Sequence, residues 1–144
     1  MRKARFCVSG AWYHVIARVN RKEFLMESAC AKTMFLEIIF RAKEKYSFLL
    51  VNLVVLGNHF HLLIKPQADD SLASIMRFIM GVYAMAYNRV YQNCGRLWGG
   101  RYFSRPIASY AEFLLVFHYI EEPWGTVPIL FFWHRKANSP LNQS

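Results

Sequence analysis

Two histidines, His59 and His61, stand two positions apart at the start of an apolar run that continues to Ile64. Successive side chains of a β-strand point to opposite faces, so a strand here would project both imidazoles side by side and direct Phe60 into a core. Two imidazoles on one rigid strand form half of a divalent-metal site and leave positions open for a substrate. The pattern is short, and two polar residues on an open sheet face would produce it as well.

The elements that would position these histidines follow from the surrounding pattern. The apolar segment 48–56, a turn at Gly57-Asn58 and the apolar segment 59–65 predict a β-hairpin. An alternating, β-rich segment over 11–20 predicts an earlier strand, on which His14 either reaches a substrate or is merely packed or solvated.

Three segments have the apolar periodicity of amphipathic helices, over residues 29–46, 72–91 and 110–122. Ser28, Asp70 or Ser71, and Ser109 are the expected N-caps. In the second helix the expected core stripe is Leu72, Ile75, Ile79, Val82, Ala86 and Val90. Its tyrosines Tyr83, Tyr87 and Tyr91 share another face, which either packs or stacks bases. In the third helix, Phe113, Leu114, Phe117 and Ile120 are expected to face the core, and Leu115, Tyr119 and Glu122 a different side.

A glycine-rich segment with arginines and aromatics, over residues 97–107, precedes the third helix and is predicted to be a loop that leads into a short strand. Arginines interleaved with aromatic rings are typical of a groove for single-stranded nucleic acid, although a plain edge strand would also fit. The interleaved residues are Arg96, Trp98, Arg101, Tyr102, Phe103 and Arg105.

The predicted order of elements is β-α-β-β-α-β-α, which defines an α+β fold. This order is that of a ferredoxin-like (RRM-like) antiparallel sheet with an added C-terminal helix. Such a sheet leaves one face for helices and the other for a substrate.

The composition is that of a folded, basic protein. At 144 residues and 55% hydrophobic content, one domain with a substantial core is expected. The formal net charge of +9 favours a polyanionic partner, although an ordinary basic surface would give the same value. Roughly 18 uninterrupted apolar residues would be needed for a membrane span, and no stretch reaches this length. The basic N-terminus does not resemble a signal peptide and the three cysteines form no paired motif, so a cytoplasmic protein without membrane contact is expected.

Motifs spread over residues 8–122 together resemble one known family. They are 12–15 (WYHV), 18–20 (RVN), 57–64 (GNHFHLLI), 87–89 (YNR), 95–103 (GRLWGGRYF) and 118–121 (HYIE). In this order they are similar to the single-tyrosine HUH transposases, and in particular to the REP-associated tyrosine transposases. The resemblance implies a metal-dependent enzyme that cuts and rejoins single-stranded DNA near hairpins through a 5′-phosphotyrosine intermediate.

The same resemblance implies roles for individual residues. His59 and His61 would hold Mg²⁺ or Mn²⁺, and Tyr119 would be the nucleophile. A tyrosine hydroxyl is a weak nucleophile, and a metal held by two imidazoles can polarise and align the phosphate that it attacks. Relatives include both dimers and monomers, so the resemblance allows either a homodimer or a monomer. The residues that we expect to contact DNA are Arg96, Arg101, Arg105, Trp98 and Tyr102.

The sequence departs from the family pattern just after the tyrosine. Relatives carry an Asn or Gln four residues beyond it, which helps to bind the metal, whereas this chain has Pro123 there. Glu122 is either a replacement third ligand or a surface charge. We therefore expect a transposase domain over residues 1–122, followed by an atypical, frameshifted or frayed tail over 123–144. The alternative function is a catalytically decayed module of the same fold that binds hairpin DNA or RNA.

Overall fold

The computed structural model describes residues 10–121 of the chain. Its elements follow the predicted order, and the predicted helices and hairpin strands agree with the observed bounds to within one residue. They are β1 (Tyr13–Arg18), the short 3-10 helix η1 (Asn20–Lys22), α1 (Ala29–Lys45), β2 (Phe48–Val55), β3 (His59–Pro66), α2 (Leu72–Tyr91), β4 (Phe103–Pro106) and α3 (Tyr110–Glu121).

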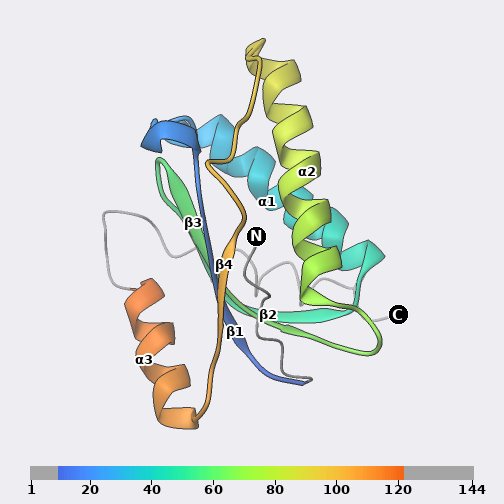
Figure 1. Ribbon diagram of the computed structural model, residues 1–144, viewed down its shortest axis with the longest axis vertical. Coiled ribbons are helices and arrows are strands. Elements are labelled where there is room, and N and C mark those ends of the chain that lie inside the picture. Colours follow the sequence, from blue (N-terminus) through green and yellow to red (C-terminus); the bar gives the residue numbers. More distant parts are fainter. Residues whose placement is uncertain (1–9, 122–144) are drawn as a thin grey trace, which may run out of the picture.

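The four strands form one antiparallel sheet in the order β2-β3-β1-β4. Helices α1 and α2 cover one face of this sheet, and α3 lies against the opposite face (Figure 1). This is the predicted ferredoxin-like sheet with an added C-terminal helix, so the sequence-based fold is confirmed. Among the described residues, no helix is long and apolar enough to cross a membrane.

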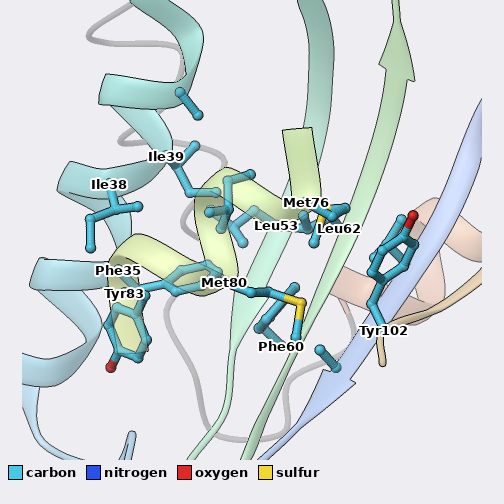
Figure 2. Close-up of a cluster of buried hydrophobic side chains, with 14 of the residues drawn as sticks. Phe35, Ile38, Ile39, Leu53, Phe60, Leu62, Met76, Met80, Tyr83 and Tyr102 are labelled. Atoms are coloured by element: carbon cyan, nitrogen blue, oxygen red, sulfur yellow. The ribbon is translucent and has the colours of Figure 1, made fainter. Parts of the chain in front are cut away.

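The main core lies between the sheet and the two helices α1 and α2 (Figure 2). The alternation of β1 directs Val15 and Ala17 into this core, and Phe60 enters it from β3. The Phe60 ring packs 4.7 Å from Phe35 of α1, measured between ring centroids. Burying a side chain of this size contributes about 1.5–3 kcal/mol to the free energy of unfolding. The core therefore fixes β3, the strand that carries both His59 and His61.

The prediction of which α2 side chains face the core was wrong at the C-terminal end of the helix. Val90 is exposed, whereas Tyr83 and Tyr87 are buried in the core. A tyrosine ring buries more apolar area than a valine side chain, and the Tyr83 hydroxyl donates a hydrogen bond to the carbonyl of Ala31 (3.0 Å). Tyr83 and Tyr87 are thus packing residues and not a platform for bases.

The expected N-caps are present on all three helices. The hydroxyl oxygens of Ser28, Ser71 and Ser109 accept hydrogen bonds from backbone N–H groups in the first turn of α1, α2 and α3. Each satisfies a donor that the helix itself leaves unpaired, which is worth about 1 kcal/mol per cap.

Helix α3 covers the second face of the sheet through a smaller core. Val116 and Ile120 pack with Val54 of β2 and Leu63 of β3. The prediction that Leu114 faces the core was wrong, because Leu114 is exposed and Val116 takes its place. The apolar residues of α3 that pack in this core are at positions 113, 116, 117 and 120. This spacing of three and four residues places them on one side of the helix.

Candidate active site

The histidine pair lies on β3, on the face that α3 only partly covers. His61 is opposite Ile16 of β1 and His59 is opposite Arg18, while Phe60 between them is fully buried on the other side of the sheet. The predicted alternation of the three residues is therefore observed. At the turn before them, a Cβ on Gly57 would overlap the ends of the Glu27 and Phe24 side chains, so a larger residue there would require both side chains to move.

Hydrogen bonding fixes the orientation and tautomer of His59. The Asn58 side-chain amide donates to the carbonyl of Lys22 (3.2 Å), which leaves the Asn58 Oδ1 atom 2.7 Å from Nδ1 of His59. An amide oxygen only accepts, so His59 donates through Nδ1 and keeps the lone pair of Nε2 for a ligand. A partner on the second nitrogen is the usual support of a metal-binding imidazole.

His61 has a different partner, the imidazole of His14 on the neighbouring strand. The His14 Nε2 atom lies 3.0 Å from His61 Nδ1, and the two rings stack with an interplanar angle of 17°. The sequence left open whether His14 contributes to a site. The structure places it, half-buried, in direct contact with one of the two predicted ligands.

Burial keeps these imidazoles neutral. It lowers the pKa of His61 to about 3, with additional lowering from His14, His59 and Arg18. Burial and the nearby Arg105 guanidinium lower the pKa of His14 to about 4. The pKa of His59 is also lowered, again by burial first and by the Arg18 charge second. The neutral imidazole is the form that binds a metal ion.

Tyr119 of α3 lies over this histidine cluster. Its ring centroid is 5.7 Å from that of His61 and 6.3 Å from that of His14, both in edge-on geometry. The Tyr119 side chain is 49% exposed, so it lies at the border between the small α3 core and solvent. The structure thus brings together the predicted nucleophile and one of the predicted metal ligands from distant parts of the sequence.

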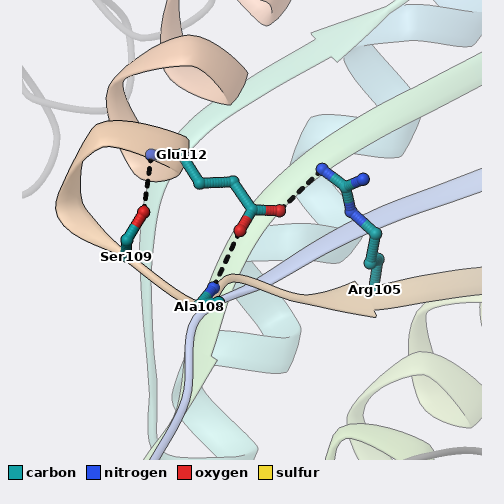
Figure 3. A network of polar contacts seen from close by, with 4 residues as sticks. All are labelled: Arg105, Ala108, Ser109 and Glu112. Atoms are coloured by element: carbon teal, nitrogen blue, oxygen red, sulfur yellow. Dashed lines mark hydrogen bonds and ion pairs between the residues drawn. The ribbon is translucent and has the colours of Figure 1, made fainter.

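Polar contacts hold α3 near both of its ends. At the N-terminal end, Glu112 forms an ion pair with Arg105 of β4 (2.8 Å) and accepts a hydrogen bond from the Ala108 N–H (3.0 Å), while its own N–H donates to Ser109 (Figure 3). Near the other end, the buried Asn52 of β2 donates to the carbonyl of Phe117 (3.0 Å). These contacts fix the helix that carries Tyr119 to two strands of the sheet.

The predicted DNA-contacting arginines occupy three different places. Arg101 lines a groove of about 700 Å³ between the end of β1, η1 and the loop before β4. Arg96 lines a smaller depression of about 250 Å³, which shares Asn20 and Arg21 with that groove. Arg105 is tied to Glu112 beside the histidine cluster.

The two predicted DNA-contacting aromatics lie in the core and not on a surface. Trp98 is buried against Phe60 and donates its indole N–H to the carbonyl of Met80 (2.9 Å). Tyr102 is buried in the same core cluster, where Figure 2 shows it. A buried ring has no face to offer a base, so we do not retain these two residues as DNA contacts. Phe103 is the aromatic side chain of this segment that reaches solvent.

The described side chains supply only some of the ligands that a metal ion would need at this site. The Nε2 atom of His59 is available as a ligand, and that of His61 is available if its Nδ1 donates to His14. Within residues 10–121, no group of three or more His, Cys, Asp or Glu side chains is arranged to hold a metal ion. The predicted third ligand, Glu122, lies outside the described residues, as does the predicted tail 123–144.

Comparisons with known proteins give a family match and two structural relatives. Residues 7–123 match the profile of the family described as "Transposase IS200 like". Among solved structures, the chain is similar to the REP-associated tyrosine transposase bound to a REP hairpin, with a TM-score of 0.73 and 17% identity over 100% of this chain and 91% of that one. It is also similar to a proposed transposase from Deinococcus radiodurans R1, with a TM-score of 0.59 and 20% identity over 84% and 96% of the two chains. No curated protein sequence matches the chain significantly.

The family match covers most of the sequence and includes the histidine pair and Tyr119. The chain therefore belongs to the IS200-like transposases, which confirms the family predicted from its motifs. The solved structures support the fold at low sequence identity, and the chemistry of the site is argued below from the residues themselves.

Proposed function

We propose that this transposase cuts and rejoins single-stranded hairpin DNA through a covalent bond between Tyr119 and a 5′-phosphate. The observation that carries the proposal is the position of Tyr119, whose ring lies 5.7 Å from His61 on the open face of the sheet. A nucleophilic hydroxyl beside imidazoles that can hold a metal ion is suited to phosphoryl transfer, because the metal ion would polarise the phosphate that the hydroxyl attacks. The hairpin substrate is inferred from the structural relative that was solved with a REP hairpin.

In the cutting step, the Tyr119 hydroxyl oxygen attacks the scissile phosphorus and loses its proton to solvent. The bond between phosphorus and the 3′-oxygen breaks, and that oxygen takes up a proton to become a free 3′-hydroxyl. The DNA 5′ end stays on Tyr119 as a phosphotyrosine ester. In the rejoining step, the 3′-hydroxyl of a second end attacks this ester and releases Tyr119, so no external energy source is consumed.

His59 and His61 would hold the Mg²⁺ or Mn²⁺ that we expect at this site. When bound, such an ion polarises the phosphate and neutralises its charge. Asn58 and His14 would orient the two ligands, since each contacts the Nδ1 atom of one of them. Two imidazoles are fewer ligands than these cations usually take, and Glu122 is our candidate for a further one.

A second function is favoured by one observation, the replacement of the expected Asn or Gln by Pro123. Loss of a metal ligand would leave a module that binds hairpin DNA without cutting it. The two functions share the same fold and the same basic groove. They differ in whether a covalent product forms.

The deciding experiment uses a labelled single-stranded hairpin with Mn²⁺, analysed on a denaturing gel. A metal-dependent covalent adduct is expected with the wild-type chain and not with Tyr119→Phe. The matched control is Tyr110→Phe, which removes another exposed hydroxyl from the same helix and should leave the adduct unchanged. Hairpin binding in a native gel without any adduct would reject the enzyme and support the binding module.

A further inference from the structure

The groove that Arg101 lines adjoins the histidine pair on the open face of the sheet, because its lining residues Ile16 and Arg18 are opposite His61 and His59. Its floor is formed by the C-terminal half of β1, which includes Ile16 and Arg18. One wall is formed by Phe103 of β4, and another by the Gly99-Gly100 loop. The loop is held against β1 by a hydrogen bond from the Gly99 N–H to the Arg18 carbonyl (2.9 Å). The groove is about 700 Å³ in volume, which is enough for a nucleotide-sized group.

The groove is strongly basic. Four cationic side chains line it, and its described lining contains no Asp or Glu. Neither Arg18 nor Arg101 forms an ion pair with a carboxylate among residues 10–121. The cations are Arg18, Arg21, Lys22 and Arg101. A concave surface with one sign of charge concentrates ligands of the opposite sign, and phosphates are the anions on which a transposase acts.

Phe103 adds an aromatic surface to this basic wall. Its side chain is 62% exposed, in contrast to Trp98 and Tyr102 of the same segment, which are buried. An exposed ring between arginines offers a π-face to any base, and base–aromatic stacking together with phosphate contacts is the usual way to hold a single strand. The chemistry of the groove therefore fits a single-stranded polynucleotide better than a free anion or an apolar ligand.

The strand register places Phe103 close to the reacting centre. Phe103 is opposite Ile16, and Ile16 is opposite His61, so the three residues form one row across the same face of the sheet. Two inter-strand spacings separate the backbone of Phe103 from that of His61, which is about 10 Å. A base held on Phe103 would thus belong to a nucleotide close in sequence to the phosphate that Tyr119 attacks.

We propose that this groove binds the single-stranded segment next to the cleavage point, with one base stacked on Phe103 and its flanking phosphates contacted by Arg18 and Arg101. The inference rests on the proposed function, because it assumes that a DNA strand reaches the histidine pair. It assigns Phe103 the role of positioning the strand, so that the scissile phosphate lies between Tyr119 and the two imidazoles.

The test measures the affinity of the full chain for a hairpin with a single-stranded extension, by fluorescence anisotropy without metal. Replacing Phe103 by Leu keeps an apolar side chain but removes the π-face, and should weaken binding about ten-fold. Phe103→Tyr should stay within about two-fold, because it keeps the ring. The control Met85→Ala removes another exposed apolar side chain, on α2, and should have no effect.

A second arm of the test removes the base instead of the ring. Abasic nucleotides are placed at each position of the extension in turn, and one position should weaken wild-type binding about ten-fold. At that position, Phe103→Leu should cause no additional loss, because the two changes delete the same contact. This coupling distinguishes a stacked base from a general effect on folding.

Each other outcome overturns the inference. Unchanged or tighter binding by Phe103→Leu would show that the ring contacts no base, as would losses that multiply at every abasic position. Neither result would affect wild-type hairpin binding or the Tyr119 adduct, so the proposed function would remain supported. Absence of any hairpin binding by the wild-type chain would overturn both proposals together.

Discussion

The imidazoles of His14 and His61 share a hydrogen bond across two adjacent strands, with His14 Nε2 3.0 Å from His61 Nδ1. One proton lies between these two atoms, so the tautomer of one ring determines that of the other. If His61 binds a metal through Nε2, its Nδ1 must donate and His14 Nε2 must accept. His14 would then support His61 as Asn58 supports His59.

Replacing His14 by Ala should therefore weaken Mn²⁺ binding by about 10- to 100-fold, which is the usual effect of losing such a supporting partner. His14→Gln should restore part of the affinity, because its amide oxygen can accept the same proton. Mn²⁺ affinity is measured by isothermal titration calorimetry on the DNA-free protein. In the same titration His59→Ala, which removes a proposed ligand, should lose more affinity than His14→Ala.

The matched control for this series is His118→Ala, which removes an exposed imidazole from α3. It should leave the Mn²⁺ affinity unchanged. Hairpin affinity without metal should also stay within about two-fold for His14→Ala, because the proposed role is in the metal site. An Mn²⁺ affinity of His14→Ala equal to that of the wild type would show that His14 is only a packed neighbour.

The local sequence patterns predicted the fold well because burial and backbone geometry determine which residues can occupy each position. The alternation around Phe60 had to direct both histidines to one face, since a slip of one residue would bury them and expose the phenylalanine. The caps at Ser28 and Ser71 are local hydrogen bonds that neighbouring residues specify. The motifs then identified the family, which the profile match confirms.

Features that depend on contacts across the sheet could not be predicted from the sequence pattern. The role of His14 follows from the register of β1 against β3, which the composition of either strand leaves undetermined. Trp98 and Phe103 belong to the same segment rich in arginine and aromatic residues, yet the indole of Trp98 is buried and bonded to the Met80 carbonyl, whereas Phe103 faces solvent. Which aromatic is buried is decided by the path of the loop over α2 and β1, and the sequence pattern does not encode that path.

The arginines should differ in their effect on the salt dependence of DNA binding. Arg101→Ala should weaken hairpin binding and reduce the slope of log K against log salt by about 1, because it removes one phosphate contact. Arg105→Ala should reduce the slope less, since the Glu112 carboxylate already neutralises much of its charge. The measurement is a salt titration of hairpin affinity for each variant. An unchanged slope for Arg101→Ala would argue against a phosphate at that position.

Asn52 connects the sheet to the helix that carries Tyr119, and its removal should affect both stability and chemistry. Asn52 is buried, its amide donates to the Phe117 carbonyl (3.0 Å), and its Oδ1 accepts from the Leu53 N–H (2.9 Å). Asn52→Leu keeps a similar volume but removes both of these hydrogen bonds. The expected loss in the free energy of unfolding is about 1–3 kcal/mol, measured by urea denaturation.

The same variant should form the Tyr119 adduct more slowly under conditions where it is fully folded. Phe117 and Tyr119 lie on the same turn of α3, so a helix released from β2 would hold the tyrosine less firmly over His61. Leu49→Ala, on an exposed position of β2, is the control and should change the free energy of unfolding by no more than about 0.5 kcal/mol. A wild-type adduct rate in folded Asn52→Leu would limit Asn52 to a structural role.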